Sequence, residues 1–131
     1  MTDRELTEKA KEAAKNSYSP YSSFTVGAAL LTGNGKVYLG CNIENAAFGP
    51  TNCAERTAFF KAISEGERSF VKIAIVGGKN GDFTDFCPPC GVCRQVMAEF
   101  CDKDFTVLLG KDGEEIRSLS LNELLPHSFG L

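Results

Sequence analysis

The chain has 131 residues, of which 43% are hydrophobic and 24% charged, and its formal net charge is −3. This size and composition predict one globular domain, residues 1–131. No apolar run reaches the roughly 18 residues of a membrane span, so we expect no membrane partner. The charged N-terminus lacks the apolar region of a secretory signal, which predicts a cytoplasmic protein. The mild acidity argues against nucleic acid as a partner, because nucleic-acid binders usually carry a basic stripe.

The first part of the chain predicts a helix followed by a hairpin. Residues 2–5 (Thr-Asp-Arg-Glu) have the pattern of a capping box, and apolar residues at helical spacing then predict a helix that ends near Asn16. Residues 24–31 and 37–41 have the composition of strands. The Gly-Asn-Gly sequence at 33–35 between them is typical of a hairpin turn, because it accepts a positive φ.

The rest of the chain predicts, in order, a helix, a strand, a helix, two strands and a final helical turn: residues 53–65, 71–76, 91–100, 105–109, 115–119 and 121–125. The succession of strand, helix and strand predicts a parallel crossover. A turn at residues 111–114 predicts that the last strand is antiparallel to its neighbour. The elements together predict an α/β fold, layered α/β/α, with a five-stranded mixed sheet.

Six cysteines are a heavy load for a reducing compartment, where clustered cysteines more often bind metal or do chemistry than form disulfides. Cys90 and Cys93 form a Cys-x-x-Cys pair, and Cys53 lies in a separate segment. Both segments fall at the predicted start of a helix, where the helix dipole stabilises a thiolate. Three protein ligands and an open fourth position are typical of catalytic zinc. We therefore predict that these three cysteines bind one Zn²⁺ per subunit.

Two residues next to Cys53 are candidates for roles at this metal. Glu55 lies on the same helical turn, from which its carboxylate can reach a metal-bound water without ligating the metal. Such a carboxylate can accept the proton of the water and deliver it to a substrate, which makes Glu55 the candidate catalytic residue. Arg56 could donate hydrogen bonds to the thiolate sulfurs from outside the ligand set. Without the neighbouring cysteine, both would be ordinary solvated helix residues.

Cys87 leaves two alternatives open. As a fourth ligand it would close the site into a structural zinc centre, and a lone Cys-x-x-Cys pair is also typical of redox proteins. Pro88 and Pro89 restrict how the chain folds back from Cys87, so we predict a free thiol near the site. Cys41 and Cys101 are predicted to be small buried hydrophobic residues.

The segments that carry these cysteines resemble the zinc-dependent cytidine deaminase family, specifically its short, homotetrameric form with three cysteine ligands. The metal motifs are Cys53-Ala-Glu-Arg-Thr-Ala and Pro89-Cys-Gly-Val-Cys-Arg-Gln. The resemblance covers nearly the whole chain through Tyr18-Ser-Pro-Tyr-Ser, Phe24-Thr-Val-Gly-Ala-Ala, Gly40-Cys-Asn-Ile-Glu-Asn-Ala and Leu124-Leu-Pro-His-Ser-Phe. A cysteine instead of a histidine as first ligand separates the chain from polynucleotide and deoxycytidylate deaminases.

The resemblance implies a cytidine deaminase-like fold and the hydrolytic deamination of cytidine and deoxycytidine to uridine and deoxyuridine, with release of ammonia, in pyrimidine salvage. In this chemistry a zinc-activated water adds to C4 of the base, and Glu55 shuttles protons to N3 and to the amino group. The resemblance also implies a homotetramer with active sites at the subunit interfaces.

The resemblance further assigns residues that bind the nucleoside substrate. Asn42 and Glu44 would hold the ribose 3′-hydroxyl by offering acceptors to it, and the carboxylate would repel a phosphate, which predicts nucleosides over nucleotides. Phe24 would lie beside the pyrimidine, and the backbone of Ala54 would read the edge of the base. Phe129 would stack on the base from a neighbouring subunit.

Phe48 departs from the family pattern, and His127 is a candidate catalytic residue that its position argues against. Phe48 stands where the family usually has tyrosine, which removes a hydrogen bond of about 1 kcal/mol near the 5′-hydroxyl. His127 is the only histidine, but its place in the C-terminal tail predicts a surface or interface residue instead of a catalytic one.

Two rival functions remain. A deaminase of another aminopyrimidine, such as a nucleoside antibiotic, would share the metal motif without needing Asn42 and Glu44. A non-enzymatic zinc module would use Cys87 as its fourth ligand. A polynucleotide editor is disfavoured, because an acidic chain neutralises phosphates poorly.

Overall fold

The computed structural model describes all 131 residues, which form four helices and five strands. The helices are α1 (Asp3–Ala14), α2 (Ala54–Ser64), α3 (Gly91–Phe100) and α4 (Leu121–Leu124). The strands are β1 (Phe24–Thr32), β2 (Val37–Cys41), β3 (Phe70–Lys79), β4 (Thr106–Gly110) and β5 (Ile116–Ser120). Every predicted element is present. None of the helices has the combination of length and apolar character that crossing a membrane requires.

The strands form one mixed sheet in the order β2-β1-β3-β4-β5. β1 is antiparallel to both of its neighbours, β3 and β4 run parallel, and β5 is antiparallel to β4. α3 connects the parallel pair, as the succession of strand, helix and strand predicted. The turn after β4 contains Gly113, whose φ of +85° few other residues adopt. The five-stranded mixed sheet with an antiparallel last strand is therefore confirmed.

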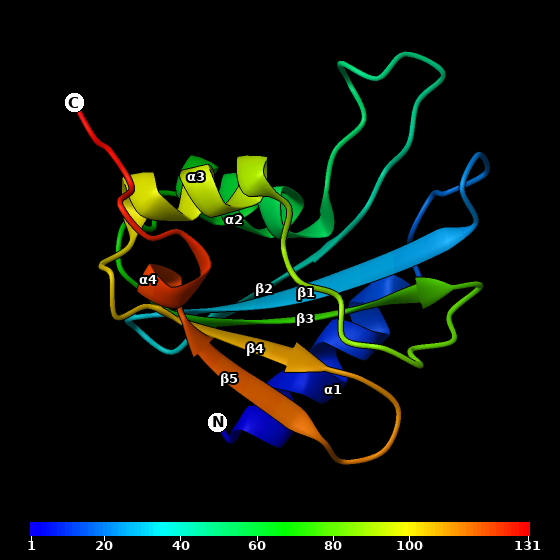
Figure 1. Ribbon diagram of the computed structural model, residues 1–131, viewed down its shortest axis with the longest axis horizontal. Helices are drawn as coiled ribbons and strands as arrows, with labels where there is room; N and C mark the ends of the chain where they lie inside the picture. Colours follow the sequence, from blue (N-terminus) through cyan, green and yellow to red (C-terminus); the bar gives the residue numbers. More distant parts are fainter.

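Helices cover both faces of the sheet, which confirms the layered α/β/α architecture. α1 lies on one face, and α2, α3 and α4 lie on the other (Figure 1). Buried residues of the strands alternate between the two layers: Ala28 and Leu30 of β1 pack with α2 and α3, whereas Ala29 packs with α1. Strands that are buried on both faces need apolar residues at successive positions. This explains the continuous apolar runs of β1, β3 and β4.

β3 continues past the predicted end of its strand through Gly77 and Gly78, which we had expected in a loop. The two glycines pair with Val26 and Thr25 of β1. A Cβ at Gly78 would lie 1.8 Å from the backbone oxygen of Asp82, so the chain after β3 folds back directly onto the strand. Here the glycines mark a close approach of two backbones within a strand and not the end of that strand.

The helix caps also differ from the prediction in one detail. Oγ1 of Thr2 accepts a hydrogen bond from the backbone N–H of Glu5 at 3.1 Å, but the reciprocal bond of a capping box is not formed. A complete capping box occurs instead at α4, where Ser120 and Glu123 each bond the backbone of the other. The short α4 therefore has a well-defined start despite its single turn.

Glycines let the helices pack directly on the sheet. A Cβ at Gly27 of β1 would lie 2.0 Å from the carbonyl oxygen of Ala10 in α1. A Cβ at Gly40 of β2 would lie 2.3 Å from the carbonyl oxygen of Ala54 and 2.6 Å from the backbone nitrogen of Ala58. The contacted backbone at Gly40 is the first part of α2. The position of the N-terminus of α2 therefore depends on a glycine in β2.

Gly40→Ala should lower the free energy of unfolding by about 3 kcal/mol, the upper end of overpacking effects, because the added methyl meets backbone that no side-chain rotation can move. Gly49→Ala is the matched control, since a Cβ there has no neighbour within 4 Å and φ is not positive. We expect the control to change stability by less than about 0.5 kcal/mol. Urea unfolding of both variants measures the difference, and equal stabilities would contradict this account of the helix packing.

Candidate active site and metal centre

A pocket of about 280 Å³ opens beside the N-termini of α2 and α3. Its walls come from four parts of the chain: the start of β1, the segment after β2, the start of α2 and the segment before α3. Seven of the predicted site residues line it: Phe24, Asn42, Glu44, Cys53, Ala54, Glu55 and Cys90. The fold therefore gathers most of the predicted site into one cavity.

The three predicted zinc ligands lie together. The Sγ atoms of Cys53, Cys90 and Cys93 are all within 4.8 Å of one another, with 3.7 Å from Cys53 to Cys90 and 3.5 Å from Cys90 to Cys93. A tetrahedral zinc with bonds of about 2.3 Å to sulfur needs ligand sulfurs about 3.8 Å apart. The donor set and its spacing therefore fit zinc. Cys87 does not belong to this cluster, which contradicts the alternative of a closed four-cysteine centre.

The local backbone explains why these thiols meet. Cys53 is the N-cap residue of α2 and Cys90 that of α3, and neither side chain makes a capping hydrogen bond. Cys93 lies one turn into α3 and is 1% exposed. The positive ends of two helix dipoles therefore face the cluster, which favours negative charge on the sulfurs.

Cys53 has a lowered pKa. A hydrogen bond from Cys93, opposed by burial and assisted by Arg56, lowers the pKa of Cys53 to about 5. The same bond, together with burial, raises the pKa of Cys93. Nη2 of Arg56 lies 3.2 Å from Sγ of Cys53, and Nε of Arg56 is buried without a partner. Arg56 is therefore not a solvated surface residue, and its charge offsets part of the thiolate charge.

Glu55 is buried in the pocket wall, with only 4% of the residue exposed. Burial first, and the nearby charge of Cys53 second, raise the pKa of Glu55 to about 7. A carboxyl group that titrates near neutral pH can both accept and release a proton, as a general acid–base must. The interpretation of Glu55 as an ordinary solvated helix residue is therefore wrong.

Asn42 is largely committed to holding the fold. Its Oδ1 accepts hydrogen bonds from the backbone N–H of Val26 at 3.0 Å and from the hydroxyl of Ser17. Its Nδ2 donates to the carbonyl of Phe24 at 2.8 Å. A side-chain amide has two N–H donors, so one donor and no acceptor is left for a ligand. The expectation that Asn42 offers an acceptor is therefore wrong, and the residue can only donate.

Glu44 is held by the loop before β1. Its Oε1 accepts hydrogen bonds from the backbone N–H groups of Tyr21 and Ser22, at 3.0 and 3.1 Å, and its Oε2 accepts one from the hydroxyl of Ser22. The Ser22 hydroxyl is the main reason that the pKa of Glu44 is lowered. Oε2 keeps a free lone pair, and Glu44 and Asn42 both line the pocket. A donor and an acceptor in one pocket match a hydroxyl group, which can both accept and donate.

Part of the remaining pocket wall is apolar. Phe24 is 41% exposed, and Ala54 is the first residue of α2, whose backbone N–H has no partner within the helix. Cys87 also lines the pocket, and burial, with a smaller contribution from the charge of Glu55, raises the pKa of Cys87 to about 11. Cys87 is therefore a neutral free thiol near the site, as predicted.

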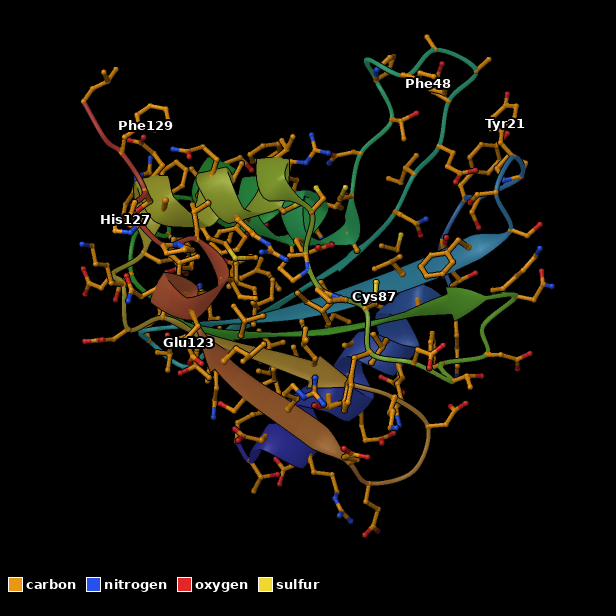
Figure 2. The ribbon with its side chains drawn as sticks, in the orientation of Figure 1. Tyr21, Phe48, Cys87, Glu123, His127 and Phe129 are labelled. Carbon is orange, nitrogen blue, oxygen red and sulfur yellow. The ribbon has the colours of Figure 1, made fainter.

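Four predicted site residues do not line the pocket. Cys93 and Arg56 lie at the cysteine cluster beside it, whereas Phe48 and Phe129 do not contact that cluster. Phe48 is 93% exposed on the loop between β2 and α2, and Phe129 is 72% exposed in the C-terminal tail, on the opposite side of the molecule in Figure 2. Phe48 borders a separate hollow with Tyr21 and Glu44. Phe129 lies near the end of α3, so it does not contribute to the pocket of its own chain.

The structure also shows the burial of the three remaining residues discussed above, His127, Cys41 and Cys101. His127 is exposed in the tail, as predicted. Cys41 and Cys101 are half-buried, although we had expected full burial. Cys101 packs against the core beneath α2 and α3, whereas Cys41 borders a surface hollow with Lys61.

Arg94, which was not among the predicted site residues, ties the segment before α3 to the C-terminal part of the chain. Its Nε donates to the carbonyl of Pro89 at 2.7 Å, and its Nη1 donates to the carbonyl of Leu124 at 2.6 Å. Pro89 is fully buried and directly precedes Cys90. Arg94 therefore fixes the approach of the chain to the metal cluster. Its place directly after the Cys-x-x-Cys pair was the signal that could have indicated it.

Comparison with known proteins agrees with this geometry. The family model described as the cytidine and deoxycytidylate deaminase zinc-binding region matches residues 1–109. The chain is 52% identical to a cytidine deaminase of Halalkalibacterium halodurans and 48% identical to one of Sporosarcina psychrophila, each over 98% of this chain and 95% or 92% of the relative. The crystal structure of cytidine deaminase from Burkholderia pseudomallei superposes with a TM-score of 0.90 at 46% identity, covering 98% of this chain and all of that one. The chain therefore belongs to the zinc-dependent cytidine deaminase family.

Proposed function

We propose that this protein hydrolyses cytidine and deoxycytidine to uridine and deoxyuridine and releases ammonia. The observation that carries the proposal is a cluster of three thiols beside a buried carboxyl group, Glu55, in one pocket. The similar proteins from Halalkalibacterium halodurans and Sporosarcina psychrophila are named cytidine deaminases. The reaction belongs to pyrimidine salvage, and we place it in the cytoplasm.

Cys53, Cys90 and Cys93 would hold one Zn²⁺ per subunit through their thiolates. Zinc held there would supply a water molecule whose pKa is lowered toward about 7. The chain supports this metal in two ways. Two helix N-termini and Arg56 stabilise the thiolates, and the pocket leaves access to one side of the cluster.

Glu55 would carry the protons of the reaction. Its carboxylate accepts a proton from the attacking water and passes it to N3 of the cytosine ring, which makes C4 electrophilic. The water oxygen then adds to C4, and Glu55 carries the remaining hydroxyl proton to the amino group. The bond between C4 and the amino nitrogen breaks, and ammonia leaves. A pKa near 7 suits a group that must gain and lose a proton twice in each turnover.

The other pocket residues would hold the nucleoside. A sugar hydroxyl would accept a hydrogen bond from the free N–H of Asn42 and donate one to Oε2 of Glu44. Phe24 would contact the pyrimidine ring, and the unpaired N–H of Ala54 would donate to the polar edge of the base. The support for these roles is that all four residues line the pocket that contains Glu55.

We also propose that a homotetramer completes each site with Phe129 from a neighbouring subunit. The support is that Phe129 is well exposed and too far round the molecule to reach the pocket of its own chain. Phe48 would lie near the 5′-hydroxyl, without the hydrogen bond that a tyrosine would make there. Its exposure on the loop next to Glu44 is compatible with that place.

Glu55→Gln tests the reaction and the role of Glu55 together. The amide keeps the shape of the side chain but cannot carry a proton, so kcat for cytidine should fall by at least about 10²-fold. Zinc content should remain one ion per chain. Loss of cytidine absorbance and elemental analysis measure the two quantities. Glu65→Gln, at the exposed end of the same helix, is the control and should keep wild-type turnover.

Three results would count against the proposal. Wild-type turnover by Glu55→Gln would remove the proton carrier from the mechanism. The second result is release of ammonia by the wild-type protein from another aminopyrimidine nucleoside but not from cytidine. That result would support deamination as the reaction and overturn cytidine as the substrate. A protein that binds zinc and deaminates neither compound would favour the non-enzymatic module.

The carboxylate of Glu44 should make the enzyme prefer nucleosides over nucleotides. We expect kcat/KM for cytidine monophosphate to be at least about tenfold below that for cytidine, because a phosphate would meet a like charge in the sugar pocket. Glu44→Gln should narrow this gap. Steady-state kinetics of the wild-type enzyme and of Glu44→Gln on both substrates measures this difference in kcat/KM. Equal turnover of the two substrates by the wild-type enzyme would contradict the role given to Glu44.

A mixing experiment tests whether Phe129 acts on a neighbouring subunit. Phe129→Ala should lower kcat/KM by roughly tenfold or more, because it removes an aromatic ring stacked on a base. When Phe129→Ala and Glu55→Gln chains are unfolded, mixed equally and refolded with zinc, roughly a quarter of the sites should combine an intact pocket with an intact tail. Recovered activity therefore supports contribution between subunits. A mixture no more active than the mean of its two components would contradict it.

A further inference from the structure

Three residues form a continuous apolar wall on one side of the pocket. Phe24 comes from the start of β1, and Cys87 and Pro88 come from the segment that leads to Cys90. A Cβ at Gly77 of β3 would lie 2.6 Å from Sγ of Cys87 and 3.2 Å from Cε2 of Phe24. The thiol and the aromatic ring therefore rest together on the bare backbone of Gly77. Figure 2 shows Cys87 over the sheet, on the strand side of α2 and α3.

The main chain on both sides of Cys87 is restrained. Behind Cys87 lies the backbone of β3 at Gly77, with no side chain that could rotate away. After Cys87 the chain continues through two prolines, whose φ angles are fixed. The second proline is fully buried, and its carbonyl accepts the 2.7 Å hydrogen bond from Arg94. The main chain that carries the thiol is therefore held in place on both sides.

The two sides of the pocket match the two sides of a cytosine ring. The proposed function puts the amino group on C4 next to Glu55 and the cysteine cluster. C5 is bonded to C4 and carries only hydrogen, so it belongs to the apolar edge of the base. That edge has to meet apolar residues close to the cluster, and Cys87 and Pro88 lie three and two residues before the ligand Cys90. The neutral thiol of Cys87 suits contact with a C–H group.

We propose that Cys87 is a specificity-determining residue that limits which substituents the enzyme accepts at C5 of the pyrimidine. The inference rests on the proposed deamination of cytidine. A methyl group at C5 would meet a thiol whose main chain is held in place, so 5-methylcytidine should be a poorer substrate than cytidine. A shorter side chain at position 87 creates the missing space, and a mismatch of one methyl group changes kcat/KM by about tenfold or more.

The test compares kcat/KM for 5-methylcytidine and cytidine in zinc-loaded wild-type protein and in Cys87→Ser and Cys87→Ala variants. The ratio of the two values should rise from wild type through Ser to Ala as the side chain shrinks, with a total gain of about tenfold. Cys101→Ala is the matched control, because it makes the same chemical change at a half-buried cysteine beyond the other end of α3. Its ratio should equal that of the wild-type protein.

The outcomes separate this inference from the proposed function. Zinc content of one ion per chain and an unchanged circular dichroism spectrum show that a variant has folded, and Cys87→Ser keeps the test decisive when Cys87→Ala has not. The role of Cys87 is overturned if the ratio of kcat/KM for 5-methylcytidine to that for cytidine is the same in wild type and in the folded Cys87 variants. It is also overturned if this ratio rises as much in Cys101→Ala as in Cys87→Ala. In both cases the proposed deamination of cytidine is unaffected. Failure of the wild-type protein to deaminate either nucleoside overturns the proposed function instead.

Discussion

Two helix N-termini bring three thiols to sulfur separations as short as 3.5 Å, and the rest of the structure serves that approach. Ionised sulfurs so close together repel one another, and burial in the protein strengthens the repulsion. The helix dipoles, the guanidinium of Arg56 and a divalent cation offset it. The first turns of α2 and α3 therefore have to meet at one point. Gly40 allows α2 to lie directly on β2, and Arg94 holds the segment that enters α3.

The same packing turns Glu55 into an acid–base group. A glutamate on the surface is ionised at neutral pH and is a poor proton donor. Here the packing that buries Ala54 and Ala58 against β2 also carries Glu55 into the pocket wall, where loss of water disfavours the carboxylate. The burial and the raised pKa of Glu55 thus follow from the position of α2, which in turn follows from the absence of a side chain at Gly40. The proton transfer proposed for Glu55 would therefore depend on the same close contact as the packing of α2 on the sheet.

Sequence reasoning succeeded where the determining interactions are local. The apolar runs, the turn glycines and the spacing of the Cys-x-x-Cys pair each depend on neighbouring residues, and they yielded the elements and two of the three ligands. Cys53 lies 37 residues before Cys90, but its own segment at a helix start indicated it as a ligand. Sequence reasoning failed where a distant partner leaves no motif in the chain. Gly77 and Gly78 extend β3 because β1 pairs with them. The side-chain Oδ1 of Asn42 accepts hydrogen bonds from Ser17 and Val26, which lie 25 and 16 residues away in the chain. The role of Arg94 depends on Leu124, 30 residues away. No local pattern carries such information.

The pairing of Arg94 with Leu124 also links the metal site to the rest of the proposed assembly. Leu124 ends α4, and the tail that follows carries Phe129 away from the pocket of its own chain.

A phenylalanine side chain that stays in water forgoes about 1.5 to 3 kcal/mol relative to a buried one. Phe48 and Phe129 are both left in that condition, on opposite sides of the molecule. In the proposed assembly, a second copy that covers these rings would recover this free energy. Arg94 bonds the backbone at both Pro89 and Leu124, so a displacement of the tail would be transmitted to Pro89, next to Cys90. In that assembly, subunit contacts and metal geometry would be coupled through one side chain.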